Sequence, residues 1–157
     1  MKPRHLLLLA TCFASACGYA RTPPGEGSCQ FDTQGITGEV IAMIHFTGGF
    51  AGLDERHLIY DDGTVETTSG AGAPETSVVP GGAARAATLA SDLRASGVYE
   101  LEPGCYDDGG MEEYDAISTS VVLGGDGGLL RLVGRGPQAL ARAIDLLGAY
   151  LGEAGAR

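Results

Sequence analysis

Residues 39–46 read Glu-Val-Ile-Ala-Met-Ile-His-Phe, and this stretch decides the fold. Apolar side chains alternate on one face, at positions 40, 42, 44 and 46, and positions 41 and 43 make the other face apolar as well. A strand with one solvated face shows apolar residues on one side only, whereas a strand covered on both faces is apolar on both. The sequence therefore predicts a central strand of a sheet.

A second strand and a helix are predicted to follow this central strand. Residues 55–60 have the composition of a strand and lead into a turn, whereas residues 69–80 are predicted to be a low-complexity connection. Residues 82–96 place Leu89 and Leu93 at helical spacing among alanines. The first half of the domain thus reads strand, strand, helix.

The second half repeats this order. Residues 117–123 alternate apolar and polar side chains, a glycine-rich turn follows, and residues 129–133 form the return strand of a hairpin. Pro137 suits the start of a helix, after which apolar residues recur three or four positions apart, at Leu140, Ile144, Leu147 and Leu151. A second helix is therefore expected to cover the same sheet face as the first.

Together these elements predict a single α+β domain over residues 38–153. We expect a four-stranded, mainly antiparallel sheet with two helices packed on one face, in the order ββαββα. In this arrangement the other face of the sheet is left for solvent or for a partner.

The first residues of the chain have the features of an export signal. Lys2 and Arg4 precede an apolar run that is too short to span a bilayer, and small residues follow it. The stretch 14–17, Ala-Ser-Ala-Cys, resembles the lipobox of bacterial lipoproteins, in which the cysteine is acylated and becomes the new amino terminus. This resemblance implies that residues 1–16 are a signal peptide and that Cys17 carries lipid. The residues that follow are rich in Gly, Pro, Ser and Thr, so we expect residues 17–37 to form a flexible tether.

The resemblance also implies a location in the bacterial cell envelope. Gly18 follows the cysteine, and by likeness to known lipoprotein sorting its identity favours an outer-membrane anchor facing the periplasm. The alternative is ordinary cleavage near Ala16 or Ala20, which would give a soluble secreted protein.

Two further cysteines fit an oxidising compartment. Cys29 and Cys105 remain once the lipidated cysteine is set aside, and we expect them to form a disulfide. Such a bond would close a loop of about 75 residues and stabilise the fold by roughly 4 kcal/mol in the chain-entropy model. The alternative is two free thiols, and the spacing of the cysteines does not suggest a zinc site.

Charge and motifs exclude several classes of function. Removal of residues 1–16 leaves eight of the ten basic residues against twenty acidic ones, a net charge near −12. This balance argues against nucleic acid as a partner. His45 and His57 stand in predicted strands without metal-ligand spacing, and no nucleophile elbow, phosphate loop or dinucleotide fingerprint occurs. We therefore expect no enzyme, no catalytic residue, no cofactor and no metal site.

An acidic loop leaves one metal alternative open. Residues 106–115 carry five carboxylates, enough oxygen ligands for Ca²⁺, but they lack the spacing of a calcium-binding loop. The favoured interpretation is a solvated loop, and the alternative is a calcium or small-ligand carrier.

The candidate partner-binding residues are Gly48, Gly49, Phe50, Ala51 and Gly52, a glycine-framed aromatic between two strands. Phe50 either folds back into the core or is presented outward as an apolar anchor for a partner.

The order of elements around this loop resembles the emfourin family, small protein inhibitors of the thermolysin-like metalloprotease protealysin. The likeness lies in residues 48–52, in the segment 98–103 after the first helix, and in the hairpin and closing helix that follow. It implies a non-catalytic inhibitor that offers Phe50 to the cleft of a metalloprotease. The alternative function is a structural or assembly lipoprotein that docks another envelope protein.

Overall fold

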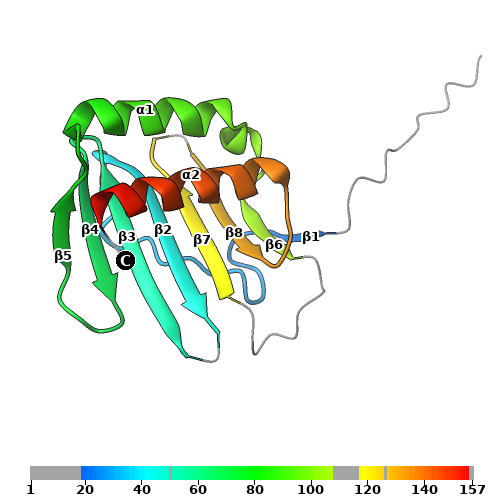
Figure 1. Ribbon diagram of the computed structural model, residues 1–157. Coiled ribbons are helices and arrows are strands. Elements are labelled where there is room, and N and C mark those ends of the chain that lie inside the picture. The colour runs from blue at the N-terminus through cyan, green and yellow to red at the C-terminus, as the bar shows by residue number, and fades with distance from the viewer. Residues whose placement is uncertain (1–18, 50, 108–116, 126, 156–157) are drawn as a thin grey trace, which may run out of the picture.

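A computed structural model describes residues 19–49, 51–107, 117–125 and 127–155. These residues form eight strands, two α-helices and one short 3-10 helix (Figure 1). In chain order the elements are β1 (Ala20–Thr22), β2 (Val40–Gly48), β3 (Leu53–Tyr60), β4 (Thr64–Ser69), β5 (Glu75–Val78), α1 (Gly82–Ala95), η1 (Val98–Glu100), β6 (Gly104–Asp107), β7 (Ile117–Leu123), β8 (Leu129–Val133) and α2 (Gln138–Ala154).

The strands form one sheet in the order β1-β6-β8-β7-β2-β3-β4-β5. Neighbouring strands are antiparallel except β6 and β8, which are parallel. The prediction of a four-stranded sheet in the order ββαββα is therefore wrong, although the class is α+β and two helices are present.

Four strands were not predicted, namely β4 and the three short strands β1, β5 and β6. Each of the three short strands has only three or four residues, so period-two alternation cannot be recognised in its sequence. β1 and β6 pair with each other across more than eighty positions, and β5 lies in the segment that was predicted to be a connection. The two edge strands, β1 and β5, are mostly polar and exposed, which is why their composition resembles that of loops.

Both helices lie on one face of the sheet and bury the main core against it (Figure 1). Leu89 and Leu93 of α1 and Leu140, Leu147 and Tyr150 of α2 are fully buried there. They pack on inward side chains of the central strands, which include Ala42, Ile44, Ile59, Val121 and Leu130. The core explains why β2 is apolar on this face.

The opposite face of the sheet is crossed by residues 23–39, which we call the strap (Figure 1). Beneath it lies a second apolar cluster of Val40, Met43, Leu58 and Val122, against which Ile36 of the strap packs. This face was expected to be open, but the strap covers part of it. The main core and the second cluster together account for the apolar residues on the two faces of β2.

The strap is fixed to the sheet by a disulfide and by arginine side chains. Cys29 and Cys105 are bonded, with their Cα atoms 5.6 Å apart, so the predicted disulfide is confirmed. Arg131 of β8 donates to the Ser28 carbonyl at 3.2 Å, and Arg56 of β3 donates to the Gln34 carbonyl at 3.2 Å. Together with β1, the strap places much of the range predicted as a tether against the folded domain.

Candidate functional site

The turn between β2 and β3 contains the candidate partner-binding residues. The strands end at the pair Gly48 and Leu53, and the Gly52 N–H donates to the Gly49 carbonyl at 3.0 Å. Gly48, Gly49 and Gly52 have φ angles of 100°, 70° and 65°, values that side chains with a Cβ rarely adopt. The turn therefore depends on its glycines, and a backbone hydrogen bond closes it.

A neighbouring strand adds an exposed apolar side chain to this turn. Gly48 pairs with Ile117 at the start of β7, and a Cβ built on Gly49 would stand 3.4 Å from Ile117 Cγ1. Ile117 is 51% exposed, and it is one of two exposed large hydrophobic residues in the described part of the chain. We call Gly48, Gly49, Ala51, Gly52, Leu53 and Ile117 the apolar tip.

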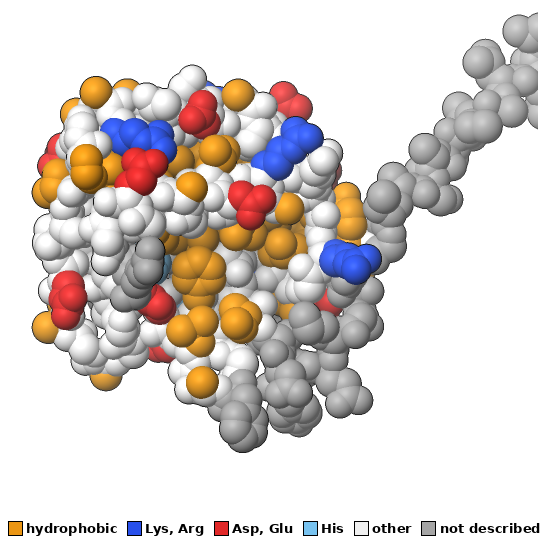
Figure 2. Space-filling model, viewed as in Figure 1, with side chains coloured by type: hydrophobic (Ala, Val, Ile, Leu, Met, Phe, Trp, Pro, Cys, Tyr) orange, Lys and Arg blue, Asp and Glu red, His pale blue; other side chains and the backbone are white. Residues whose placement is uncertain are grey.

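The apolar tip continues onto the helix-side face of the sheet. Phe46, two residues before Gly48, is half-buried and packs at the margin of the main core. Figure 2 shows hydrophobic side chains gathered on this part of the surface, below α2, where the helices do not cover the sheet. An apolar surface at the end of a rigid sheet is suited to contact with another protein.

The sequence prediction located the turn but missed Ile117. Four of the five predicted residues, Gly48, Gly49, Ala51 and Gly52, lie together, whereas Phe50 lies outside the described residues. Cys17 and residues 108–115 of the acidic loop also lie outside them, so the structure does not test lipidation or calcium binding. Nothing in the alternation of residues 117–123 showed that the first residue of β7 would be left exposed.

His57 is buried in the sheet. It is 2% exposed, its Nδ1 lies 2.9 Å from Thr67 Oγ1, and its Nε2 lies 3.2 Å from Glu55 Oε1. Burial lowers the pKa of His57, and the carboxylate of Glu55 raises it by a smaller amount. Hydroxyl, imidazole and carboxylate resemble a catalytic triad, but the imidazole that would have to act as the base is buried, with 2% of its surface exposed.

His45 lies in a polar hollow of about 270 Å³ between the strap and the β2–β3 hairpin. Its Nε2 lies 2.7 Å from Asp54 Oδ1, and Arg56 is paired with Asp32 at 3.2 Å in the same hollow. The Arg56–Asp32 ion pair attaches the strap to the hairpin, whereas His45 and Asp54 pair within the hairpin. In the described part of the chain, no three potential metal ligands lie close enough to share an ion.

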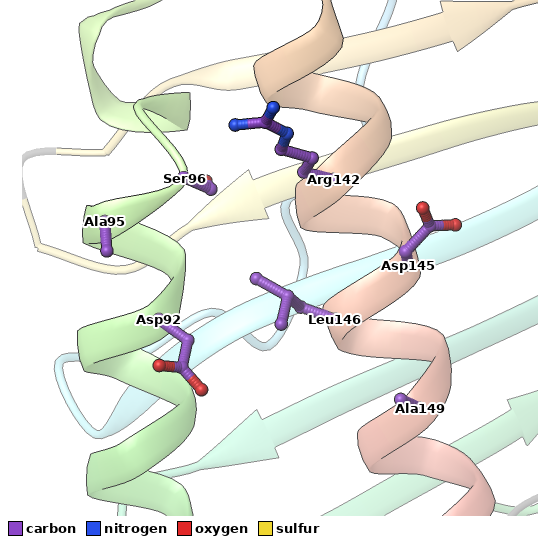
Figure 3. A pocket seen from close by; sticks show the side chains of 7 residues that line it. All are labelled: Asp92, Ala95, Ser96, Arg142, Asp145, Leu146 and Ala149. Atoms are coloured by element: carbon purple, nitrogen blue, oxygen red, sulfur yellow. The ribbon is translucent and has the colours of Figure 1, made fainter.

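A groove of about 610 Å³ separates the outer surfaces of α1 and α2. Leu146 projects from α2 toward α1 and Arg142 reaches toward Ser96, while Asp145 points away from α1 (Figure 3). The groove is shallow and mixed in character, and its side chains carry no arrangement for catalysis. It remains a surface feature without an assigned ligand.

Comparison of the chain with protein-family models, with curated proteins and with solved structures finds no match. Among the described residues, no helix is long and apolar enough to cross a membrane. The features that bear on function are therefore the apolar tip and the sequence that precedes the domain.

Proposed function

We propose that this chain is a lipid-anchored protein of the bacterial cell envelope whose domain binds another protein without catalysing a reaction. The lipid would be attached at Cys17, and the apolar tip would contact the partner. The proposal rests above all on the exposure of Ile117 beside a turn whose backbone requires three positive-φ glycines. Ile117 belongs to a paired strand, so its backbone loses little conformational entropy on binding, which favours recognition.

Two other observations support this proposal. The disulfide between Cys29 and Cys105 fits a protein that folds outside the cytoplasm. The polar clusters around His45 and His57 are satisfied internally, so they offer no activated group to a substrate. Among the described surfaces, the apolar tip is then the one whose exposed apolar side chain a bound partner would best shield from water.

A thermolysin-like metalloprotease is the partner class implied by the likeness to the emfourin family. Such a protease accepts large apolar side chains in its cleft, and the glycines of the tip allow a close approach of backbones. The domain would then act as an inhibitor and would itself contribute no catalytic group. The assembly alternative draws less support, because the strap covers part of the sheet face through which docking was envisaged.

Affinity capture from detergent-solubilised envelope tests the binding role. The wild-type domain is compared with Ile117→Ser and with Val78→Ser, which removes an exposed apolar residue, 62% exposed, at the far edge of the sheet. We expect Ile117→Ser to lose about tenfold in affinity, since roughly half of an isoleucine side chain would be buried at the contact. The control Val78→Ser should behave as wild type.

Two outcomes would contradict the proposal. Equal recovery of the same proteins by wild type and Ile117→Ser would remove the role of the apolar tip. Mass spectrometry of the mature amino-terminal peptide with an unmodified Cys17 thiol would remove the lipid anchor. Inhibition itself is tested by titrating the domain against several thermolysin-like proteases, and unchanged hydrolysis by all of them would exclude this partner class among those enzymes.

A further inference from the structure

The start of β1 and the apolar tip lie at the same end of the sheet. Ala20 pairs with Asp107 of β6, Asp107 pairs with Val133 of β8, and Val133 pairs with Ser118 of β7. Ala20 and Ser118 therefore stand in one row across the sheet, and Ile117 is the next residue along β7. Figure 1 shows β1 at one edge of the sheet and β5 at the opposite edge.

The spacing between neighbouring strands gives the distance from Ala20 to Ile117. Three inter-strand steps separate β1 from β7, and at about 4.8 Å each they place Ile117 roughly 15 Å from Ala20. β5 is seven steps from β1, so Val78 at that edge lies on the order of 34 Å away. The apolar tip therefore lies closer than the β5 edge to the residue at which β1 begins.

The chain between Cys17 and the sheet is short. Only three residues of chain lead from Cys17 to Ala20, and they span at most about 11 Å in any conformation. Tyr19 is itself packed on Tyr106, with ring centroids 5.7 Å apart. Because β1 is paired and the strap is disulfide-bonded, the chain that follows is fixed to the sheet and adds no further reach.

We infer that the apolar tip binds a protein held at the same membrane as the lipid anchor. This inference rests on the proposed function, in which Cys17 is acylated. The two distances together keep Ile117 within about 26 Å of the lipid-bearing residue, however the domain swings on its link. A partner that contacts the tip must reach this layer, and a protein held at the same membrane is concentrated there, which favours it over a freely diffusing protein.

Charge favours a protein over the lipid surface as the occupant. The mature chain has a net charge near −12, which opposes close contact with anionic lipids. Asp54, next to Leu53, is exposed at the tip, where one of its oxygens lies 2.7 Å from His45 Nε2. The complementary surface is an apolar pocket with a cationic rim.

Fluorescence in vesicles tests the geometry, because the chain contains no tryptophan. Lipidated Ile117→Trp and Val78→Trp proteins are placed in phosphatidylethanolamine and phosphatidylglycerol vesicles that carry a dansyl headgroup acceptor. We expect energy transfer from position 117 to be at least twice as efficient as from position 78. Equal or weaker transfer from position 117 would overturn the inference, and Ala51→Trp repeats the measurement should Ile117→Trp fold poorly.

A second measurement distinguishes lipid from protein as the occupant. Brominated acyl chains in the same vesicles should leave tryptophan 117 unquenched, whereas strong quenching would show that the tip enters the bilayer and would overturn the inference. In cells, a photo-crosslinker at position 117 should attach to a membrane-held protein. Its yield should fall about tenfold when the domain is exported without lipid, because the effective concentration is lost.

The outcomes separate this inference from the proposed function. An unchanged crosslink to the same protein after removal of the lipid would overturn the membrane-restricted partner while leaving partner binding intact. A crosslink to a soluble protein would do the same. Absence of any protein crosslink from position 117, with Cys17 shown to be acylated, would refute both the inference and the binding role of the tip.

Discussion

Cys29 of the strap is bonded to Cys105 of β6 across 76 positions of sequence. β6 lies between β1 and β8 in the sheet, so this single bond fastens the strap to the strand on which β1 pairs. The disulfide thereby turns a segment with the composition of a linker into part of the domain.

Removal of this disulfide should cost a large part of the stability. We expect Cys29→Ser combined with Cys105→Ser to lower the free energy of unfolding by about 4 kcal/mol, because the unfolded chain regains the entropy of a long loop. Urea denaturation monitored by circular dichroism measures the difference. The wild type under reducing conditions should match the double variant, and equal stability of oxidised wild type and double variant would show that the strap is held by its other contacts.

The glycines of the apolar tip should be needed for their backbone conformation. Gly52 has a φ of 65° with open space around its Cα, so an added methyl group would meet no neighbour and only backbone strain would act. Gly52→Ala should therefore destabilise the domain by about 1 kcal/mol. Gly38→Ala is the matched control, because Gly38 also faces open space but is not in the left-handed region. Similar stabilities of the two variants would argue that the turn relaxes without cost.

Two tyrosines should respond oppositely to loss of their hydroxyl groups. The Tyr150 hydroxyl is buried and has no hydrogen-bond partner among the described residues, whereas the Tyr106 hydroxyl donates to the Glu102 carbonyl at 2.6 Å. We expect Tyr150→Phe to raise the free energy of unfolding by about 1 kcal/mol and Tyr106→Phe to lower it by a similar amount. Thermal melts of both variants give the signs, and destabilisation by Tyr150→Phe would reveal a partner for its hydroxyl.

The long, periodic elements could be predicted from sequence because each one carries its own pattern. Residues 39–46 alternate over enough positions to identify a buried strand, and Leu89 with Leu93 marks the inward side of α1. β5 gave no such signal because it lies at the sheet edge, where Val78 and its neighbours face solvent. β6 is recognisable only from its pairing with β1 and β8, which are distant in sequence.

The candidate site was predictable to the same extent. A run of glycines between two strands indicates a turn with positive φ angles, and the structure has this turn at Gly48, Gly49 and Gly52. The proximity of Ile117 could not be predicted, since it depends on the register between β2 and β7. The short distance between Ala20 and the tip depends in turn on β1, a strand of three residues.

Acid should weaken the fold through His57. Burial lowers the pKa of its imidazole in the folded state, more than Glu55 raises it, so the unfolded chain binds a proton more readily than the folded one below about pH 6.5. Stability from this group is therefore complete above pH 6.5 and declines as the pH falls toward the lowered pKa, by at most about 1.4 kcal/mol per pH unit. The measurement is urea unfolding between about pH 5 and pH 8 for the wild type, His57→Gln and the control His45→Gln. His57→Gln should flatten the decline, whereas His45→Gln should retain the contribution of His57. An equally steep decline in His57→Gln would assign the acid sensitivity to other groups.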